Sequence, residues 1–314
     1  MLLNSALPTD RRRRSLLAGS AAAAALLLAG CQTPPAPPQA EPPSLPPLIP
    51  PPLVVPRPPR IGLALGGGAA RGFAHIGVIQ VLEENGIRPE LVVGTSAGSL
   101  VAALYASGKG GKELAGLAQG MDESALTDWS FPGRGLIRGE ALARYVRAQT
   151  GGLLIEQMKL PLGIVATDLS DGAPVMFQRG DTGAAVRASS AVPAVFQPVP
   201  IGNREYVDGG LVSPVPVRFA RQMGADLVIA VDISSPPDGN ATGDAFRMLL
   251  QTFAIMGRSI SRLELKDADI VLRPTLVGVA SADFTARMKA IQSGRDAALA
   301  QLPALRSRIT ALTR

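Results

Sequence analysis

The chain has 314 residues, 46% of them apolar and 18% charged, which is enough apolar material for one large or two small folded domains. Its formal charge is +6, of which the first 30 residues carry +3, so the remaining chain is only mildly basic. Basic residues are not interleaved with aromatic ones, which argues against nucleic acid as a partner. The single cysteine excludes an internal disulfide, and together with the single histidine it argues against a metal site built on Cys or His.

The first 30 residues have the layout of a secretory signal peptide. Four arginines at 11–14 precede an apolar stretch at 15–28, which is too short to remain as a membrane span. Small residues then lead to Cys31 in a pattern that resembles the lipobox of bacterial lipoproteins, in which the cysteine is lipidated and becomes the new N-terminus. The arginines also resemble the core of a twin-arginine export signal.

Lipidation at Cys31 is favoured because the only cysteine falls at the expected cleavage point. The alternative is an ordinary cleaved signal with an incidental cysteine. Gln32 stands where an aspartate would resemble a signal for retention in the inner membrane. We therefore expect a lipid-anchored protein of the bacterial cell envelope, held at the outer membrane and facing the periplasm.

Residues 31–60 are expected to be the lipidated cysteine followed by a linker. Fourteen of the chain's 28 prolines lie between Pro34 and Pro59. Proline fixes φ and removes a backbone donor, so this segment is predicted to be an extended spacer with a reach on the order of 80–90 Å. The predicted organisation is a signal peptide at 1–30, this tether at 31–60 and one folded domain at 61–314.

From residue 61 onward, strand-length and helix-length segments alternate. Apolar runs predict buried strands at 61–65, 91–93, 162–167, 227–233 and 270–272. Helical spacing predicts helices at 73–84, 139–150, 244–266 and 283–312. This alternation predicts an α/β fold with a mainly parallel sheet. The 283–312 segment fits a membrane-surface helix or a helix packed on the domain, and packing is favoured. Trp129 is likewise expected to be buried rather than at the mouth of a pocket.

The segment 94–98 has the form Gly-x-Ser-x-Gly, with Ser96 at its centre. A serine on a tight turn between strand and helix is held in strained backbone geometry with its hydroxyl exposed. Glycine fits the positions two before and two after it, because the backbones pass too close for side chains there. Ala97 begins the helix, whose free N–H groups favour negative charge. The segment therefore predicts a nucleophile, and the alternative is a glycine-rich turn with an incidental serine.

The loop before the first helix contains three consecutive glycines, Gly66, Gly67 and Gly68. A dinucleotide-binding fingerprint would need glycine at Arg71, and a phosphate-binding nucleotide loop would need lysine at Phe73. The remaining interpretation is an oxyanion hole, formed by exposed glycine N–H groups beside the nucleophile. Only this interpretation gives both loops one role.

A general base for Ser96 has to be a carboxylate. The only histidine, His75, lies on the first helix, where a packed or hydrogen-bonded role is favoured over a catalytic triad. Asp208 is favoured as the base because it ends a probable strand and two glycines follow it, although Asp-Gly-Gly can also form a plain turn. The competing carboxylates are Asp168, Asp171, Asp181 and Asp232. Burial would have to raise the pKa of such an acid from its ordinary value of about 3.9.

These segments together resemble the patatin-like phospholipase family. The similar motifs are 66–72, 94–98 and 208–210, in the family's order, with further similar segments at 188–193 and 206–211. The resemblance spans roughly 61–235. It implies a three-layer α/β/α fold and a Ser–Asp dyad that hydrolyses lipid acyl esters. By this resemblance Ser96 is the nucleophile, Asp208 its partner and the 66–68 loop, with Ala97, the oxyanion hole.

The expected protein is therefore a lipid-tethered acyl hydrolase that needs no metal and no cofactor. Arg71 either supports the acyl carbonyl or a lipid phosphate, or forms a surface salt bridge, and the sequence favours neither. Two other functions remain open. One is an acyltransferase that uses the same acyl-enzyme, and the other is a non-catalytic lipoprotein that binds lipid or a partner.

Overall fold

The computed structural model describes residues 56–122, 128–129, 134–234, 243–279 and 283–314. The predicted signal peptide, the lipidation at Cys31 and most of the linker lie outside these ranges and stay predictions. Within the described ranges, no helix is both long enough and apolar enough to cross a membrane.

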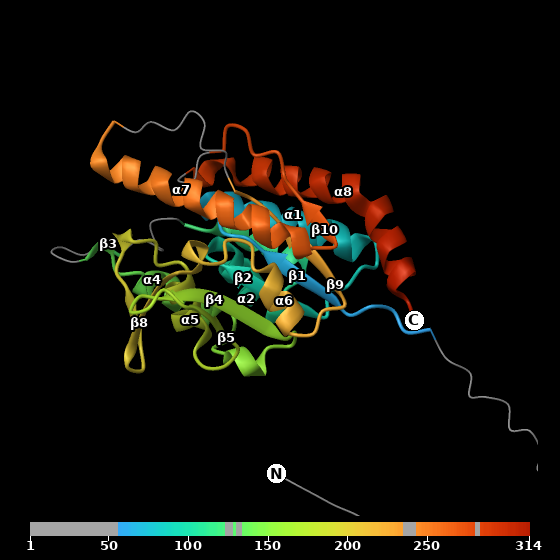
Figure 1. The fold of residues 1–314 in the computed structure, drawn as a ribbon, viewed down its shortest axis with the longest axis horizontal. Coiled ribbons are helices and arrows are strands. Elements are labelled where there is room, and N and C mark those ends of the chain that lie inside the picture. Colours follow the sequence, from blue (N-terminus) through green and yellow to red (C-terminus); the bar gives the residue numbers. More distant parts are fainter. Residues whose placement is uncertain (1–55, 123–127, 130–133, 235–242, 280–282) are drawn as a thin grey trace, which may run out of the picture. The chain divides into compact units, whose positions relative to one another are not determined.

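The strands and helices predicted from the sequence are present, and the structure adds short strands between residues 135 and 201 and a helix at 182–189 that were not predicted (Figure 1). The strands are β1 (Ile61–Leu65), β2 (Leu91–Thr95), β3 (Gly135–Ile137), β4 (Leu162–Asp168), β5 (Pro174–Phe177), β6 (Ala194–Phe196), β7 (Val199–Ile201), β8 (Arg204–Asp208), β9 (Leu227–Val231) and β10 (Ile270–Leu272). The α-helices are α1 (Phe73–Glu84), α2 (Ala97–Ala106), α3 (Gly111–Gly120), α4 (Glu140–Gln149), α5 (Thr182–Ser189), α6 (Val217–Gln222), α7 (Ala245–Glu264) and α8 (Arg287–Leu312). The short 3-10 turns used below are η1 (Ala69–Gly72), η4 (Gly209–Leu211) and η6 (Phe284–Ala286).

An eight-stranded sheet runs in the order β10-β9-β1-β2-β4-β8-β7, and β5 also pairs with β4. The first five strands of this order are parallel, whereas β5, β8 and β7 pair in antiparallel fashion. The predicted α/β class with a mainly parallel sheet is confirmed. A tight turn at Gly202, whose φ is +63°, joins β7 to β8 and makes this pair antiparallel, and β8 in turn pairs antiparallel with β4. Asp208, at the end of β8, is thereby placed opposite Ala166 of β4.

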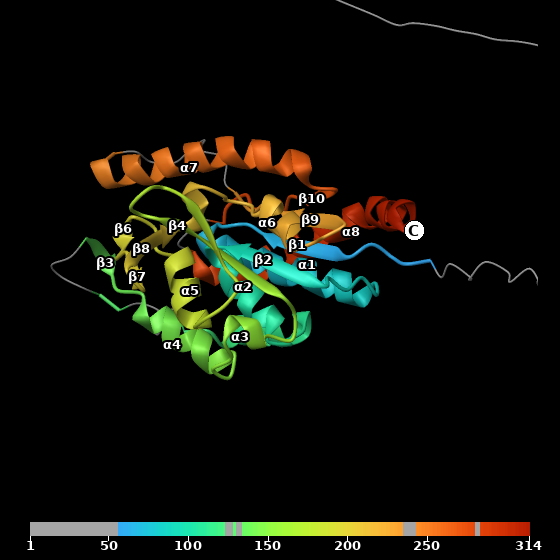
Figure 2. The ribbon, with the colours of Figure 1, turned by 60° about the horizontal axis from the view of Figure 1, so that its bottom comes forward.

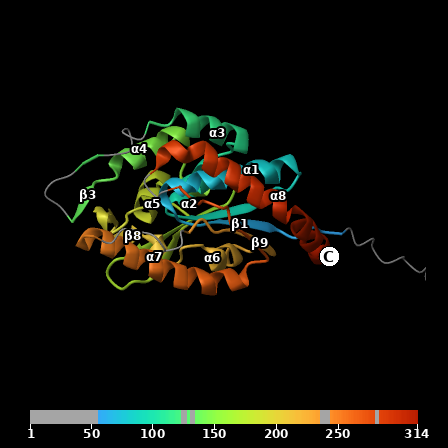
Figure 3. The same cartoon turned by 90° about the horizontal axis from the view of Figure 1, so that it is seen from above.

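Helices cover both faces of the sheet and give it three layers. The layer on one face includes α1, α3 and α8, and α6 and α7 lie on the other (Figures 2 and 3). Successive residues of β1 point to opposite faces, so that Leu63 and Leu65 pack in the core beneath α1 and α8 while Ala64 packs with α6. The central strands are buried on both faces, which explains their uninterrupted apolar runs.

The C-terminal helix α8 packs along α1, as the favoured interpretation predicted (Figure 3). The two backbones approach closely because each helix carries a glycine at the contact. A Cβ added at Gly77 would lie 1.9 Å from the carbonyl oxygen of Ile291, and one added at Gly294 would lie 1.9 Å from that of Ala74. Arg295 adds an ion pair to Glu84 with a separation of 2.7 Å.

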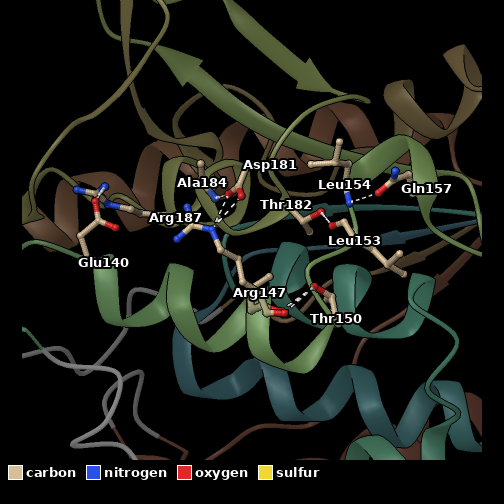
Figure 4. A network of polar contacts seen from close by, with 11 residues as sticks. Glu140, Arg147, Thr150, Leu153, Leu154, Gln157, Asp181, Thr182, Ala184 and Arg187 are labelled. Atoms are coloured by element: carbon tan, nitrogen blue, oxygen red, sulfur yellow. Dashed lines mark hydrogen bonds and ion pairs between the residues drawn. The ribbon is translucent and has the colours of Figure 1, made fainter.

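Polar contacts hold α5 against α4 (Figure 4). The Arg147 Nε donates to Asp181 Oδ2 over 2.8 Å, and the same carboxylate caps the N-terminus of α5. Arg187, farther along α5, pairs with Glu140 at the start of α4. The last residue of α5 is Ser189, so this network fixes the position of a residue that reaches the candidate site.

We predict that Gly294→Ala destabilises the protein by about 1–3 kcal/mol, because its methyl group would collide with the backbone of α1. The matched control is Gly116→Ala in α3, where an added Cβ meets nothing within 4 Å. There alanine should stabilise the helix by up to about 1 kcal/mol. Urea unfolding of both variants measures the difference. Equal free energies of unfolding would contradict the close crossing of α1 and α8.

Candidate active site

Ser96 sits in strained backbone geometry between β2 and α2, with φ +53° and ψ −125°. A Cβ added at Gly94 would lie 2.4 Å from the carbonyl oxygen of Gly98, and one added at Gly98 would lie 2.1 Å from that of Leu65. The two glycines are therefore required by the close approach of these backbones, as the Gly-x-Ser-x-Gly spacing predicted. Ser96 itself is half-buried.

Three hydrogen bonds fix the Ser96 turn in place. The Ser96 N–H donates to Ser189 Oγ over 2.9 Å, and the Ser189 hydroxyl donates to the carbonyl oxygen of Val165 over 2.5 Å. The Thr95 hydroxyl donates to the carbonyl oxygen of Ser213 over 2.8 Å. Ser189 lies in the family-like segment 188–193, but no local pattern assigns it this role, because its partner lies 93 positions away along the chain.

Asp208 is held by its backbone as well as by its side chain. Its N–H donates to the carbonyl oxygen of Ala191 over 3.0 Å, and its own carbonyl oxygen accepts from the Thr167 hydroxyl over 2.8 Å. Its Oδ1 accepts the Gly210 N–H over 2.7 Å. Gly209 has a steric cause, because an added Cβ would lie 2.2 Å from the carbonyl oxygen of Val165, and the turn that follows brings the Gly210 N–H to the carboxylate.

Burial raises the pKa of the Asp208 carboxyl to about 6, while the nearby Ser96 hydroxyl and the Gly210 N–H act in the opposite direction. Asp208 Oδ2 is fully buried, and no described residue makes a well-directed hydrogen bond to it. The carboxylate thus has a free, desolvated oxygen in the neighbourhood of the Ser96 hydroxyl.

The competing carboxylates are all occupied by arginine. Asp168 and Asp171 share Arg204, Asp181 pairs with Arg147, and Asp232 lies 3.5 Å from Arg273. Ser170 and Arg204 lower the pKa of Asp168, which makes it a weaker base. Asp208 is the one of these five acids that has no cationic partner within the described ranges, and burial raises its pKa. In those ranges no group of three or more His, Cys, Asp or Glu could hold a metal ion.

The glycine loop lies directly beside the Ser96 turn. A Cβ added at Gly67 would be 3.1 Å from the Cβ of Ser96. The Gly67 N–H, however, donates to the carbonyl oxygen of Pro214 over 2.9 Å, and the Gly66 N–H donates to that of Val231 over 3.1 Å. The prediction that both amides are exposed is therefore wrong, because both form hydrogen bonds that attach the loop to neighbouring segments.

Two amides of the predicted set remain free to donate. Neither the Gly68 N–H nor the Ala97 N–H makes a hydrogen bond to another described residue. Ala97 begins α2, and its N–H is one of the unpaired donors of a helix N-terminus. The structure thus reduces the candidate oxyanion donors from four to these two.

Arg71 and His75 hold the glycine loop through its carbonyl oxygens. Arg71 is only 8% exposed, so the surface salt-bridge interpretation is wrong, and its Nε donates to the carbonyl oxygen of Gly68 over 3.3 Å. His75 is fully buried, with Nε2 2.8 Å from the carbonyl oxygen of Gly66. Burial lowers the pKa of His75 to about 4, so the ring is neutral and donates to that carbonyl. This packed role is the one favoured from the sequence.

An apolar cavity of about 70 Å³ has Ala97, one of the two candidate donors, in its wall. It is lined by Ala69, Phe73, Ala97, Leu100, Leu104, Leu114, Leu117, Tyr145 and Phe284, among others. Trp129 is not part of this lining and is 64% exposed, so the expectation that it is buried is wrong. Such a cavity suits a flexible hydrocarbon chain attached to a group held at Ser96.

Known proteins share this arrangement of segments. A family model described as patatin-like phospholipase matches residues 63–221, just over half of the chain. An uncharacterised NTE family protein of Mycobacterium tuberculosis is 39% identical over 208 residues, which are 65% of this chain and 58% of that protein. Patatin-like phospholipase domain-containing protein 6 of Mus musculus is 35% identical over 183 residues, which are 56% of this chain and 14% of that protein. The chain thus spans less than two thirds of the length of these relatives.

A solved structure shares the fold. VipD from Legionella pneumophila superimposes with a TM-score of 0.54 at 17% sequence identity, over 79% of this chain and 68% of that one. The family match covers the glycine loop, the Ser96 turn and the Asp208 strand together. On this evidence the chain belongs to the patatin-like phospholipase family.

Proposed function

We propose that this protein is a serine acyl hydrolase that cleaves acyl esters of lipids through Ser96 and Asp208. The observation that carries the proposal is the buried Asp208 carboxylate, which lacks a cationic partner and lies beside a strained serine. Both features cost stability, which is typical of a catalytic site. Membership of the family supports a lipid ester as the substrate.

In the first step, the Ser96 Oγ attacks the carbonyl carbon of the ester and its proton moves to the Asp208 carboxylate. A base with a pKa of about 6 is ionised at neutral pH and still holds a proton well enough to receive it. The negative oxygen of the tetrahedral intermediate accepts hydrogen bonds from the Gly68 and Ala97 N–H groups. Each such donor is worth about 2.7–4 kcal/mol of barrier.

The intermediate then expels the alcohol, which takes the proton from Asp208 and leaves the acyl group on Ser96. A water molecule attacks this acyl-enzyme and gives its proton to Asp208. The bond between the Ser96 Oγ and the acyl carbon then breaks, the Oγ takes the proton back from Asp208, and the carboxylic acid leaves. Arg71 positions the loop by holding the Gly68 carbonyl oxygen, and His75 holds that of Gly66.

The apolar cavity receives the acyl chain in this proposal. Ala97 contributes both a candidate oxyanion donor and part of the cavity wall. The acyl chain of an ester whose carbonyl oxygen is held at that donor therefore begins beside the cavity. Few polar atoms line the cavity, which disfavours a charged head group there. The head group then remains on the solvent side of Ser96.

We predict that Ser96→Ala lowers hydrolysis of a chromogenic ester by about a thousandfold or more and abolishes labelling by a fluorophosphonate probe, because no nucleophile remains. Asp208→Asn should also lose most activity while it keeps the fold. The control is Ser107→Ala at the end of α2, whose hydroxyl only caps the carbonyl of Leu104. Full activity in Ser96→Ala would exclude the dyad. Product analysis with added alcohols separates hydrolysis from acyl transfer.

A second prediction concerns chain-length preference. Leu117→Trp should lower kcat/KM for a decanoyl ester at least about tenfold more than for an acetyl ester, because the larger side chain fills the cavity and spares the reacting groups. Leu299→Trp, on the exposed side of α8, should leave that ratio unchanged. An equal loss of kcat/KM with both esters would show that the acyl chain does not enter this cavity.

A further inference from the structure

Helix α7 carries an apolar face that no described residue covers. Met248 and Ile255 are seven residues apart, as are Leu249, Met256 and Leu263, so each set falls on one side of the helix. These five side chains are 39–65% exposed. We call them the α7 surface. Only Ser261 is buried in the whole 20-residue helix. The helix therefore exposes an unusually large apolar area to water.

The charges around the α7 surface are basic. Arg258 and Arg262 make no ion pair with any described residue, and Arg247 pairs only with the exposed Asp244 at the helix N-cap. The single acid within α7, Glu264, is not part of the surface, because it accepts a hydrogen bond from the buried Ser213 hydroxyl over 2.5 Å. The exposed part of the helix thus combines apolar side chains with uncompensated arginines.

We propose that the α7 surface docks the domain on an anionic phospholipid bilayer. Its apolar side chains would enter the boundary between head groups and acyl chains to about 5–10 Å, and its arginines would meet lipid phosphates. Each basic residue near an anionic membrane strengthens the binding. Pairing with a second copy is disfavoured, because it would bring the arginines of both copies together without acids to balance them.

The position of α7 connects this surface to the candidate site. A Cβ added at Gly257 would lie 3.6 Å from the Pro214 side chain and 3.8 Å from the carbonyl oxygen of Gly210. The inner side of α7 therefore packs against the loop that follows Asp208, while its outer side faces away from the sheet (Figure 2). Docking would hold that loop next to the bilayer. The proposal does not depend on catalysis by Ser96.

The test uses the full chain with Trp129→Phe, so that one introduced tryptophan reports its own surroundings. Met256→Trp places the reporter in the α7 surface, and Leu299→Trp places a matched reporter on α8. Vesicles of phosphatidylcholine with about one third phosphatidylglycerol carry brominated acyl chains, which quench only nearby tryptophan. We expect the fluorescence of Met256→Trp to fall at least about twofold and that of Leu299→Trp to stay unchanged. Arg258→Gln combined with Arg262→Gln should weaken this binding about tenfold or more.

Several results would overturn the proposal. These are the absence of quenching at Met256→Trp, equal quenching at Leu299→Trp, and equal quenching by vesicles of phosphatidylcholine alone. Protection of Met256→Trp from iodide without vesicles would show another occupant: a second copy if protection rises with protein concentration, and a segment of the same chain if it does not. Ile255→Trp serves as a second reporter if Met256→Trp fails to fold. No outcome requires hydrolytic activity, so failure of docking is distinguishable from failure of the proposed reaction.

Discussion

One short backbone segment, residues 213–215, joins the separate parts of the candidate site. The carbonyl oxygen of Ser213 accepts the Thr95 hydroxyl, which precedes the nucleophile, and that of Pro214 accepts the Gly67 N–H of the glycine loop. The Ser213 N–H donates to the carbonyl oxygen of Gly209, directly after the candidate base. This segment therefore positions the serine, the glycine loop and the acid relative to one another, and a shift of the segment would displace all three.

The site is built at a cost in stability. Asp208 Oδ2 and His75 Nδ1 are buried without hydrogen-bond partners among the described residues, and each such atom costs about 1–3 kcal/mol. Ser96 adds backbone strain. The surrounding sheet is buried on both faces and supplies the rigidity that holds these groups in place. Desolvation of Asp208 is also what raises its pKa, so the same burial that costs stability prepares the proposed base.

Much of this arrangement could be predicted from local sequence. Buried parallel strands appear as apolar runs in the sequence. The glycines around Ser96 predict a close approach of backbones, which the structure contains. The amide partners of Gly66 and Gly67 could not be predicted, because those carbonyls come from segments far along the chain. The antiparallel strand that carries Asp208 depends on pairing with β4, which no local pattern specifies. Amphipathicity alone also could not show that α8 would be covered and the α7 surface exposed, since packing decides which face meets water.

The central claim is that burial without a cationic partner raises the pKa of the Asp208 carboxyl to about 6. Because its folded pKa lies above its ordinary value, the fold favours the protonated form, and this contribution to stability is lost as pH rises from about 4 through about 6. The most direct test is a titration of the Asp208 carboxyl carbon by 13C NMR, assigned by comparison with Asp208→Asn. The account predicts a midpoint near pH 6. A midpoint near the ordinary value of 3.8 would contradict it.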